Sequence, residues 1–310
     1  MDYLLFLQNL RCASPEAVNL FLLYVSNFTG SVFLMIIPVF VYWCIDKKAG
    51  IYMTMCFSIA VFLNQTLKNI FCVLRPHVRW ESIVPMDKAL DGATGFSFPS
   101  GHTTLAAGVY GGIAVWQKKR KWVVLLCILL TLLTAFSRNW LGVHTLADTA
   151  GAIFFACFSV FIATCIEKYI KKNPKAFLPA VILAIASALF SIAFICLKPY
   201  PKECGELVDI YAMQTDSFKS AGVLLGFACG VYIEQRFVNF SNSGKMSERI
   251  VRFIVGFAAI SALYTFVFPI IFSPFGEHWG KLLKYFFLML SVLALYPAVF
   301  SYFSNRKSQR

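Results

Sequence analysis

Three short strings of the sequence carry ionisable residues at the ends of strongly apolar segments. They are Lys68-x6-Arg75-Pro76, Pro99-Ser100-Gly101-His102 and Ser137-Arg138-x5-His144-x3-Asp148. Charged groups are costly where a membrane helix meets hydrocarbon, so residues of this kind usually belong to a site. Together they offer cations for an anionic group and a histidine–carboxylate pair for nucleophilic attack. The sequence therefore predicts a phosphate pocket that contains a nucleophile.

The spacing of His144 and Asp148 predicts an oriented imidazole. Four residues apart at the start of a helix, the two side chains share a face, and the carboxylate accepts the proton of one ring nitrogen. The other nitrogen can then attack phosphorus and form a phosphohistidine, which divides hydrolysis into two displacements. We expect His102 to be the acid and base that protonates the leaving group and later activates water.

Five further residues are predicted to bind the phosphate. Lys68 and Arg75 are seven residues apart, about two turns, so we expect them on one face of a helix. Arg138 adds a second planar guanidinium. Ser100 is expected to cap the helix that begins near Gly101, whose free amides form an anion site. Because side chains supply the charge, we expect no metal and no other cofactor, in line with four histidines and no carboxylate cluster.

The composition places these strings in a membrane protein. Of 310 residues, 59% are hydrophobic and 14% charged, and the mean hydropathy is +0.70. Apolar runs close to the roughly 20 residues that cross a ~30 Å hydrocarbon layer recur along the chain. They lack strand-like alternation, so we predict an all-α polytopic bundle. Nine spans are expected, at residues 29–45, 50–72, 101–117, 121–137, 144–165, 176–197, 217–235, 250–272 and 281–303.

The remaining organisation is simple. Residues 1–28 are apolar but form short runs, so we expect interfacial or re-entrant helices there, with a tenth span as the alternative. We expect a single integral membrane domain over residues 1–310, with the motifs at 68–148 and additional spans at 198–310. A disulfide between Cys204 and a neighbouring cysteine near the outer face is left open.

The distribution of positive charge predicts the orientation in the membrane. The net charge is +13, and with nine spans the basic turns all lie on one side, at residues 47–48, 118–121, 168–175, 236–252 and 306–310. This side is cytoplasmic by the positive-inside rule. The pattern therefore favours membrane topology over nucleic-acid binding. We expect an outer N-terminus, a cytoplasmic C-terminus and an exoplasmic site.

Aromatic residues follow the first motif. Trp80, Phe96 and Phe98 lie in the stretch 78–99, where two interpretations are open. They guide a lipid tail at headgroup depth, or they form an ordinary aromatic belt. His77 is interpreted as a loop residue, and His278 as structural.

In order and internal spacing, the three strings resemble the signature of the type 2 phosphatidic acid phosphatase superfamily. This resemblance covers residues 68–148 and implies a six-helix membrane core with His144 as the nucleophile. The nine-span plan is similar to that of glucose-6-phosphatase and sphingosine-1-phosphate phosphatase. The resemblance also implies that the substrate carries a phosphate group.

These observations predict a metal-independent phosphatase that hydrolyses a phosphomonoester or pyrophosphate of a lipid. We expect it in the plasma membrane, with membrane lipids and a lipid phosphate as its partners. A sugar-phosphate phosphatase and a lipid phosphotransferase with the same site stay open as alternatives. The non-enzymatic alternative is a transporter of phosphate compounds, but an anion site alone does not need His102, His144 and Asp148 together.

Overall fold

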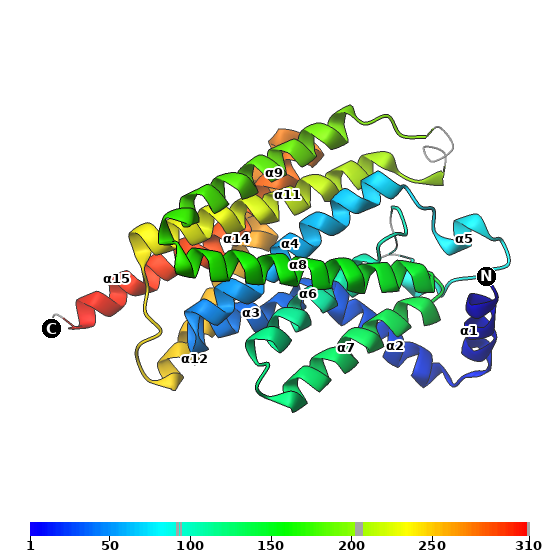
Figure 1. Cartoon of the computed structure of the whole chain (residues 1–310), viewed down its shortest axis with the longest axis horizontal. Helices are drawn as coiled ribbons and strands as arrows, with labels where there is room; N and C mark the ends of the chain where they lie inside the picture. Colours follow the sequence, from blue (N-terminus) through cyan, green and yellow to red (C-terminus); the bar gives the residue numbers. More distant parts are fainter. Residues whose placement is uncertain (91–92, 94, 202–206, 309–310) are drawn as a thin grey trace. The chain divides into compact units, whose positions relative to one another are not determined.

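The computed structural model describes residues 1–90, 93, 95–201 and 207–308, so Cys204 and its proposed disulfide lie outside the described residues. Every regular element in these ranges is helical (Figure 1), which confirms the all-α prediction. The α-helices are α1 (Asp2–Ala13), α2 (Glu16–Gly30), α3 (Ile36–Phe40), α4 (Lys47–Phe71), α5 (Pro76–Arg79), α6 (Gly101–Trp116), α7 (Lys121–Trp140), α8 (Leu146–Lys172), α9 (Phe177–Leu197), α11 (Ile210–Ile233), α12 (Met246–Ala262), α13 (Phe268–Phe272), α14 (Gly276–Leu290) and α15 (Tyr296–Ser308).

Six helical stretches of the described chain are long and apolar enough to cross a membrane. They are Lys47–Arg79, Lys121–Trp140, Leu146–Lys172, Pro174–Leu197, Ile210–Val238 and Met246–Tyr302. A seventh is counted if Glu16–Gly30 and Phe33–Ile45, which meet at a bend of 62°, form one broken span. The chain is therefore a multi-pass membrane protein, but the prediction of nine spans is not confirmed.

Two segments account for much of this difference. Helix α6 has 16 residues, fewer than the roughly 20 that cross a bilayer. Residues 246–302 form one helical stretch of 57 residues, where the sequence predicts two spans. At about 1.5 Å per residue that stretch measures roughly 86 Å, more than two crossings of a ~30 Å layer. A 3₁₀ turn at Ser273–Phe275 interrupts the α-helix between the two predicted spans.

The described chain forms two compact units. The first contains residues 1–35, 59–162 and 197–214, and it holds all three motifs. Within it, α2 packs against α6 and α7, and α1 packs against α7. The first unit is therefore the part of the fold that builds the site.

The pattern of burial explains how the helices of this unit pack. The buried residues of α2 recur at helical spacing and include Leu22, Ser26 and Thr29. Helix α7 buries a stripe of polar residues that ends in Arg138, while leucines such as Leu129 are exposed on its other faces. Polar residues thus point inward and apolar ones outward, as expected for a helix surrounded by lipid.

The second unit contains residues 36–58, 163–196 and 215–310. Within it, α13 packs against α14, and α12 packs against the π-helical turn Val41–Ile45. Its described residues include an ion pair between the partly exposed Lys47 and the buried Glu234, in which Lys47 Nζ lies 2.6 Å from Glu234 Oε1.

Candidate active site

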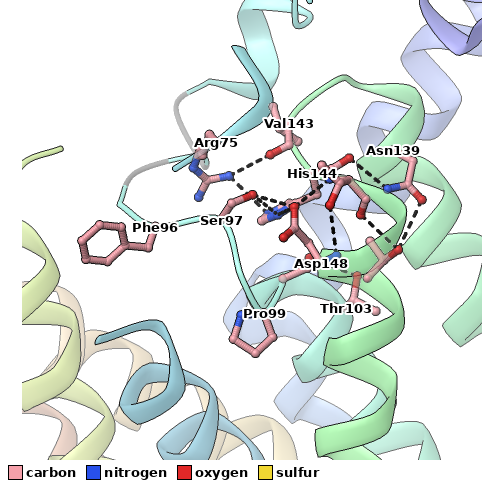
Figure 2. A network of polar contacts seen from close by, with 12 residues as sticks. Arg75, Phe96, Ser97, Pro99, Thr103, Asn139, Val143, His144 and Asp148 are labelled. Carbon is pink, nitrogen blue, oxygen red and sulfur yellow. Dashed lines mark hydrogen bonds and ion pairs between the residues drawn. The ribbon is translucent and has the colours of Figure 1, made fainter. Parts of the chain in front are cut away.

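His144 lies in the loop between α7 and α8, with both ring nitrogens in contact with site residues (Figure 2). Its Nδ1 is 3.6 Å from Asp148 Oδ2, and its Nε2 is 3.2 Å from Arg75 Nη1. Only 1% of His144 and 2% of Asp148 is exposed. The two side chains therefore meet as their spacing predicts. The predicted local structure is wrong in one respect, because α8 begins two residues after His144.

The contacts of Asp148 fix the tautomer of the imidazole. Oδ2 accepts hydrogen bonds from Ser97 Oγ at 2.6 Å and from the Thr145 amide at 2.7 Å. These donors favour an ionised carboxylate, which in turn favours a proton on His144 Nδ1. The Nε2 lone pair then accepts from the arginine. Burial, followed by the charge of Arg75, lowers the pKa of His144 well below its ordinary value, so the imidazole is neutral at neutral pH.

Hydrogen bonds from side chains to backbone carbonyls hold the His144 loop in place. Asn139 Nδ2 donates to the His144 carbonyl at 2.9 Å, and Arg75 Nη1 donates to the Val143 carbonyl at 3.2 Å. From α1, Arg11 Nη1 donates to the Trp140 carbonyl at 2.8 Å. Side chains from α1, from α7 and from the linker before α5 thus fix the position of the imidazole.

Lys68 and Arg75 do not share a helical face, contrary to the prediction. Helix α4 ends three residues after Lys68, and Cys72 adopts a positive φ of 48°, which a right-handed helix cannot accommodate. Arg75 therefore lies in the linker before α5. Both side chains bind the same segment, since Lys68 Nζ donates to the Phe96 carbonyl and Arg75 Nε donates to the Gly95 carbonyl at 2.9 Å.

Arg138 ends α7 as a buried guanidinium, 1% exposed. Its Nη1 donates to Ser26 Oγ at 2.6 Å. Among the described residues, its Nε and Nη2 are buried without a hydrogen-bond partner. Buried donors are rarely left unpaired, and this edge of a guanidinium matches two oxygens of a phosphate.

Ser100 directly precedes α6, as predicted, but its side chain does not cap the helix. The hydroxyl instead lies 3.1 Å from Thr103 Oγ1, from which it accepts a hydrogen bond, and the Ser100 amide donates to the Asp148 carbonyl at 3.1 Å. The predicted cap is therefore wrong. At Gly101, an added Cβ would meet, among the described residues, only Asn64 Oδ1, at 3.8 Å, so the described neighbours do not require glycine there.

His102, on the first turn of α6, joins the same site. Its imidazole lies within electrostatic range of Arg138, His144, Arg75 and Lys68. The ring also packs tightly against α2, because a Cβ on Gly30 would lie 2.1 Å from His102 Nε2. The described structure therefore brings together the cations and both histidines of the three motifs.

Sequence reasoning missed three residues of this site: Ser97, Asn139 and Ser26. Ser97 and Asn139 stand next to predicted motifs, which is the only signal that could have suggested them. Ser26 has no such signal because it lies on α2, far from any motif.

A further correction concerns Phe96, which is fully buried and stacks on Tyr200 with ring centroids 6.4 Å apart. It therefore belongs to neither a headgroup-level guide nor an aromatic belt.

The other two histidines lie apart from these contacts. His77 is in α5, and its Nδ1 is buried without a partner among the described residues. His278 belongs to the second unit and packs edge-on against Phe218, with ring centroids 5.0 Å apart. Within the described ranges, no group of three or more His, Cys, Asp and Glu side chains could hold a metal ion. Metal independence stays a prediction.

Known families match most of the chain. Residues 49–172 match the PAP2 superfamily, and residues 218–308 match the transmembrane extension of PAP2 superfamily phosphatases. The chain belongs to the PAP2 superfamily. The first range contains all three motifs, so the resemblance predicted from them is confirmed. The second range lies in the second unit.

Two curated proteins are each similar to about two fifths of the chain. An undecaprenyl-diphosphatase of Sulfolobus acidocaldarius is 27% identical over 121 residues, which cover 39% of this chain and 56% of that protein. Phosphatidylglycerophosphatase B of Bacillus subtilis is 30% identical over 132 residues, 40% of this chain and 60% of that protein. The chain thus spans less than two thirds of each relative. No solved structure matches the chain.

Proposed function

We propose that this PAP2 protein is a metal-independent membrane phosphatase that hydrolyses a phosphomonoester or pyrophosphate of a lipid. The proposal rests on the net positive charge of the buried side chains in the site. Lys68, Arg75 and Arg138 are each at most 5% exposed, and Asp148 is the buried carboxylate among them. With neutral histidines the site has a net charge of +2. Uncompensated buried charge is strongly unfavourable, and a phosphate dianion would neutralise it.

The geometry supports a two-step reaction. When the substrate binds, its phosphate dianion favours protonation of His102. His144 Nε2 then attacks phosphorus, the bond between phosphorus and the leaving oxygen breaks, and the His102 imidazolium gives that oxygen its proton. The phosphorylated imidazole is cationic, and Asp148 stabilises it through Nδ1. Water then attacks the phosphohistidine, with its proton going to His102, the P–N bond breaks, and neutral His144 and phosphate result. Lys68, Arg75 and Arg138 bind the oxygens that carry negative charge in both transition states.

A lipid substrate is supported by the membrane helices and by the relatives. The names of both relatives denote enzymes that act on lipid phosphates. A site at the ends of membrane helices suits a phosphate headgroup on an apolar tail. A sugar phosphate as the substrate, and an alcohol rather than water as the acceptor, are the alternatives that the same residues allow.

We further propose that the site faces the exoplasmic side of the plasma membrane. The basic turns flanking the helices support this orientation, since Lys and Arg are enriched in cytoplasmic loops. The C-terminus is then cytoplasmic. The lipid phosphate would reach the site from the outer leaflet.

The proposal is tested by phosphate release from phosphatidic acid or undecaprenyl pyrophosphate in detergent with EDTA present. We expect release that vanadate inhibits, because vanadate mimics five-coordinate phosphorus. His144→Ala should lose at least a hundredfold in kcat, since a covalent nucleophile contributes several kcal/mol. The control is Ser159→Ala, because within the described residues Ser159 Oγ donates to a carbonyl of its own helix, Phe155 O, 2.9 Å away. Absence of wild-type release on these lipids and on sugar phosphates would favour the transporter.

A further inference from the structure

Helix α2 lies outside both ranges that match the PAP2 superfamily, yet it contacts two residues of the site. Ser26 accepts a hydrogen bond from Arg138, and Gly30 lies against the His102 ring. Both contacts occur within the first compact unit. The sequence predicted interfacial or re-entrant helices over residues 1–28, with a tenth span as the alternative, and no part in the site.

We propose that Ser26 is a positioning residue that orients the Arg138 guanidinium toward the transferred phosphoryl group, so that α2 forms a wall of the catalytic site. The inference rests on the proposed function. It assigns a role in the reaction to a segment that the family match does not include.

The hydrogen bonds of Arg138 define this role. A guanidinium has five N–H donors in one rigid plane, so fixing one nitrogen restricts the direction of the others. Ser26 Oγ holds Nη1 at 2.6 Å, and the Nε and Nη2 edge is left buried and unpaired among the described residues. That edge is the one that binds two oxygens in parallel. Ser26 thus binds one edge of the guanidinium and leaves the Nε–Nη2 edge for the substrate.

The surroundings of the Ser26–Arg138 hydrogen bond explain why the guanidinium depends on it. Arg75 lies within electrostatic range of Arg138. Because the two positive charges repel each other, the Arg138 guanidinium needs a partner that holds it in place. Ser26 is completely buried, so water cannot easily replace its hydroxyl. The residue is fixed on α2 by the packing of this helix against α6 and α7. Removing the hydroxyl leaves the guanidinium free to turn away from Arg75 and from the substrate.

The close contact at Gly30 points to the same role for α2. The His102 ring occupies the space that a Cβ at position 30 would fill, with Cδ2 and Nε2 each 2.1 Å from that Cβ. A helix that sets both Arg138 and His102 touches the phosphate ligand and the acid–base group together. A shift of α2 would therefore disturb binding and proton transfer at once.

The experiment compares Ser26→Ala and Ser26→Cys with Ser159→Ala in the full-length protein. We expect both Ser26 variants to lose about tenfold in kcat/KM and to bind vanadate about tenfold more weakly, because a hydrogen bond to a charged group is lost. Thermal stability should match that of the control. In an Arg138→Ala background, Ser26→Ala should have no further effect, since the two residues act as one unit.

Vanadate inhibition and kcat/KM equal to those of Ser159→Ala would overturn the inference, as would a full additional loss in the Arg138→Ala background. If Ser26→Ala does not fold, Ser26→Cys decides, because it keeps the volume and provides only a weak acceptor. A failure of the proposed function itself looks different, since the wild-type protein would then release no phosphate.

Discussion

Ser97 provides the sharpest test of how the nucleophile is activated. Its hydroxyl donates to Asp148 Oδ2 at 2.6 Å and lies 3.3 Å from His144 Nδ1. When the imidazole is phosphorylated it becomes cationic, and the ionised carboxylate must then stabilise a full positive charge. We expect Ser97→Ala to weaken that stabilisation in the transition state while leaving phosphate binding nearly unchanged.

The magnitude follows from what remains around the carboxylate. A hydrogen bond to a charged group contributes about 1.5–3 kcal/mol. The Thr145 amide stays in place, 2.7 Å from the same oxygen, so we expect the lower end of this range. A loss of about 1.5 kcal/mol corresponds to roughly a tenfold decrease in kcat. KM should change less, since no phosphate ligand is removed.

The assay is steady-state phosphate release from phosphatidic acid in detergent micelles, with Ser159→Ala as the matched serine control. Ser97→Thr keeps the hydroxyl and should retain more activity than Ser97→Ala. A kcat for Ser97→Ala above half the wild-type value would refute the reasoning. So would a loss that appears in KM alone.

Three further predictions address the acid, the nucleophile and the topology. His102→Ala should be severely impaired on an alkyl phosphate but partly restored on an aryl phosphate, whose leaving group needs no proton; equal losses on both would remove this role. Since burial and Arg75 lower the pKa of His144, kcat/KM should fall only below the ordinary histidine pKa of about 6.5, where the nucleophile becomes protonated. Asp148→Asn should lower the rate and move this acid limb to still lower pH, because the carboxylate raises that pKa; a shift to higher pH would contradict the assignment. Single cysteines at Lys88 and Lys119, both exposed, in a background without accessible native cysteines, should label oppositely in intact cells, with position 88 reacting from outside; labelling of position 119 alone would reverse the orientation.

The spacing of residues in the sequence was sufficient to predict contacts between residues that are close in sequence. The His144–Asp148 contact depends on a separation of four residues, and the helical character of the chain follows from uninterrupted apolar runs. The Lys68–Arg75 prediction failed because it assumed that a periodic pattern continues as a helix. The positive φ at Cys72 depends on tertiary contacts of the linker and has no periodic signal.

Two of the missed residues, Ser26 and Ser97, join the site through contacts between distant segments. Ser26 and Arg138 are 112 residues apart in the chain, and Arg11 and Trp140 are 129 apart. A serine on one apolar helix cannot be assigned to an arginine on another until the packing of the two helices is known. The count of nine spans is not confirmed, because α6 is shorter than a full crossing and residues 246–302 form one helical stretch. The predicted break between residues 272 and 281 nevertheless coincides with the 3₁₀ turn at Ser273–Phe275.

The contact between Arg75 and His144 has a consequence for chemical selectivity. An arginine N–H lies 3.2 Å from His144 Nε2, whose lone pair is expected to attack phosphorus. This contact masks the nucleophile, and an anion that draws the guanidinium toward itself would unmask it. We expect neutral histidine-modifying reagents such as diethyl pyrocarbonate to react slowly with this imidazole. Reactivity is thus coupled to the arrival of a phosphate group, which protects a buried nucleophile from the many other electrophiles that dissolve in a membrane.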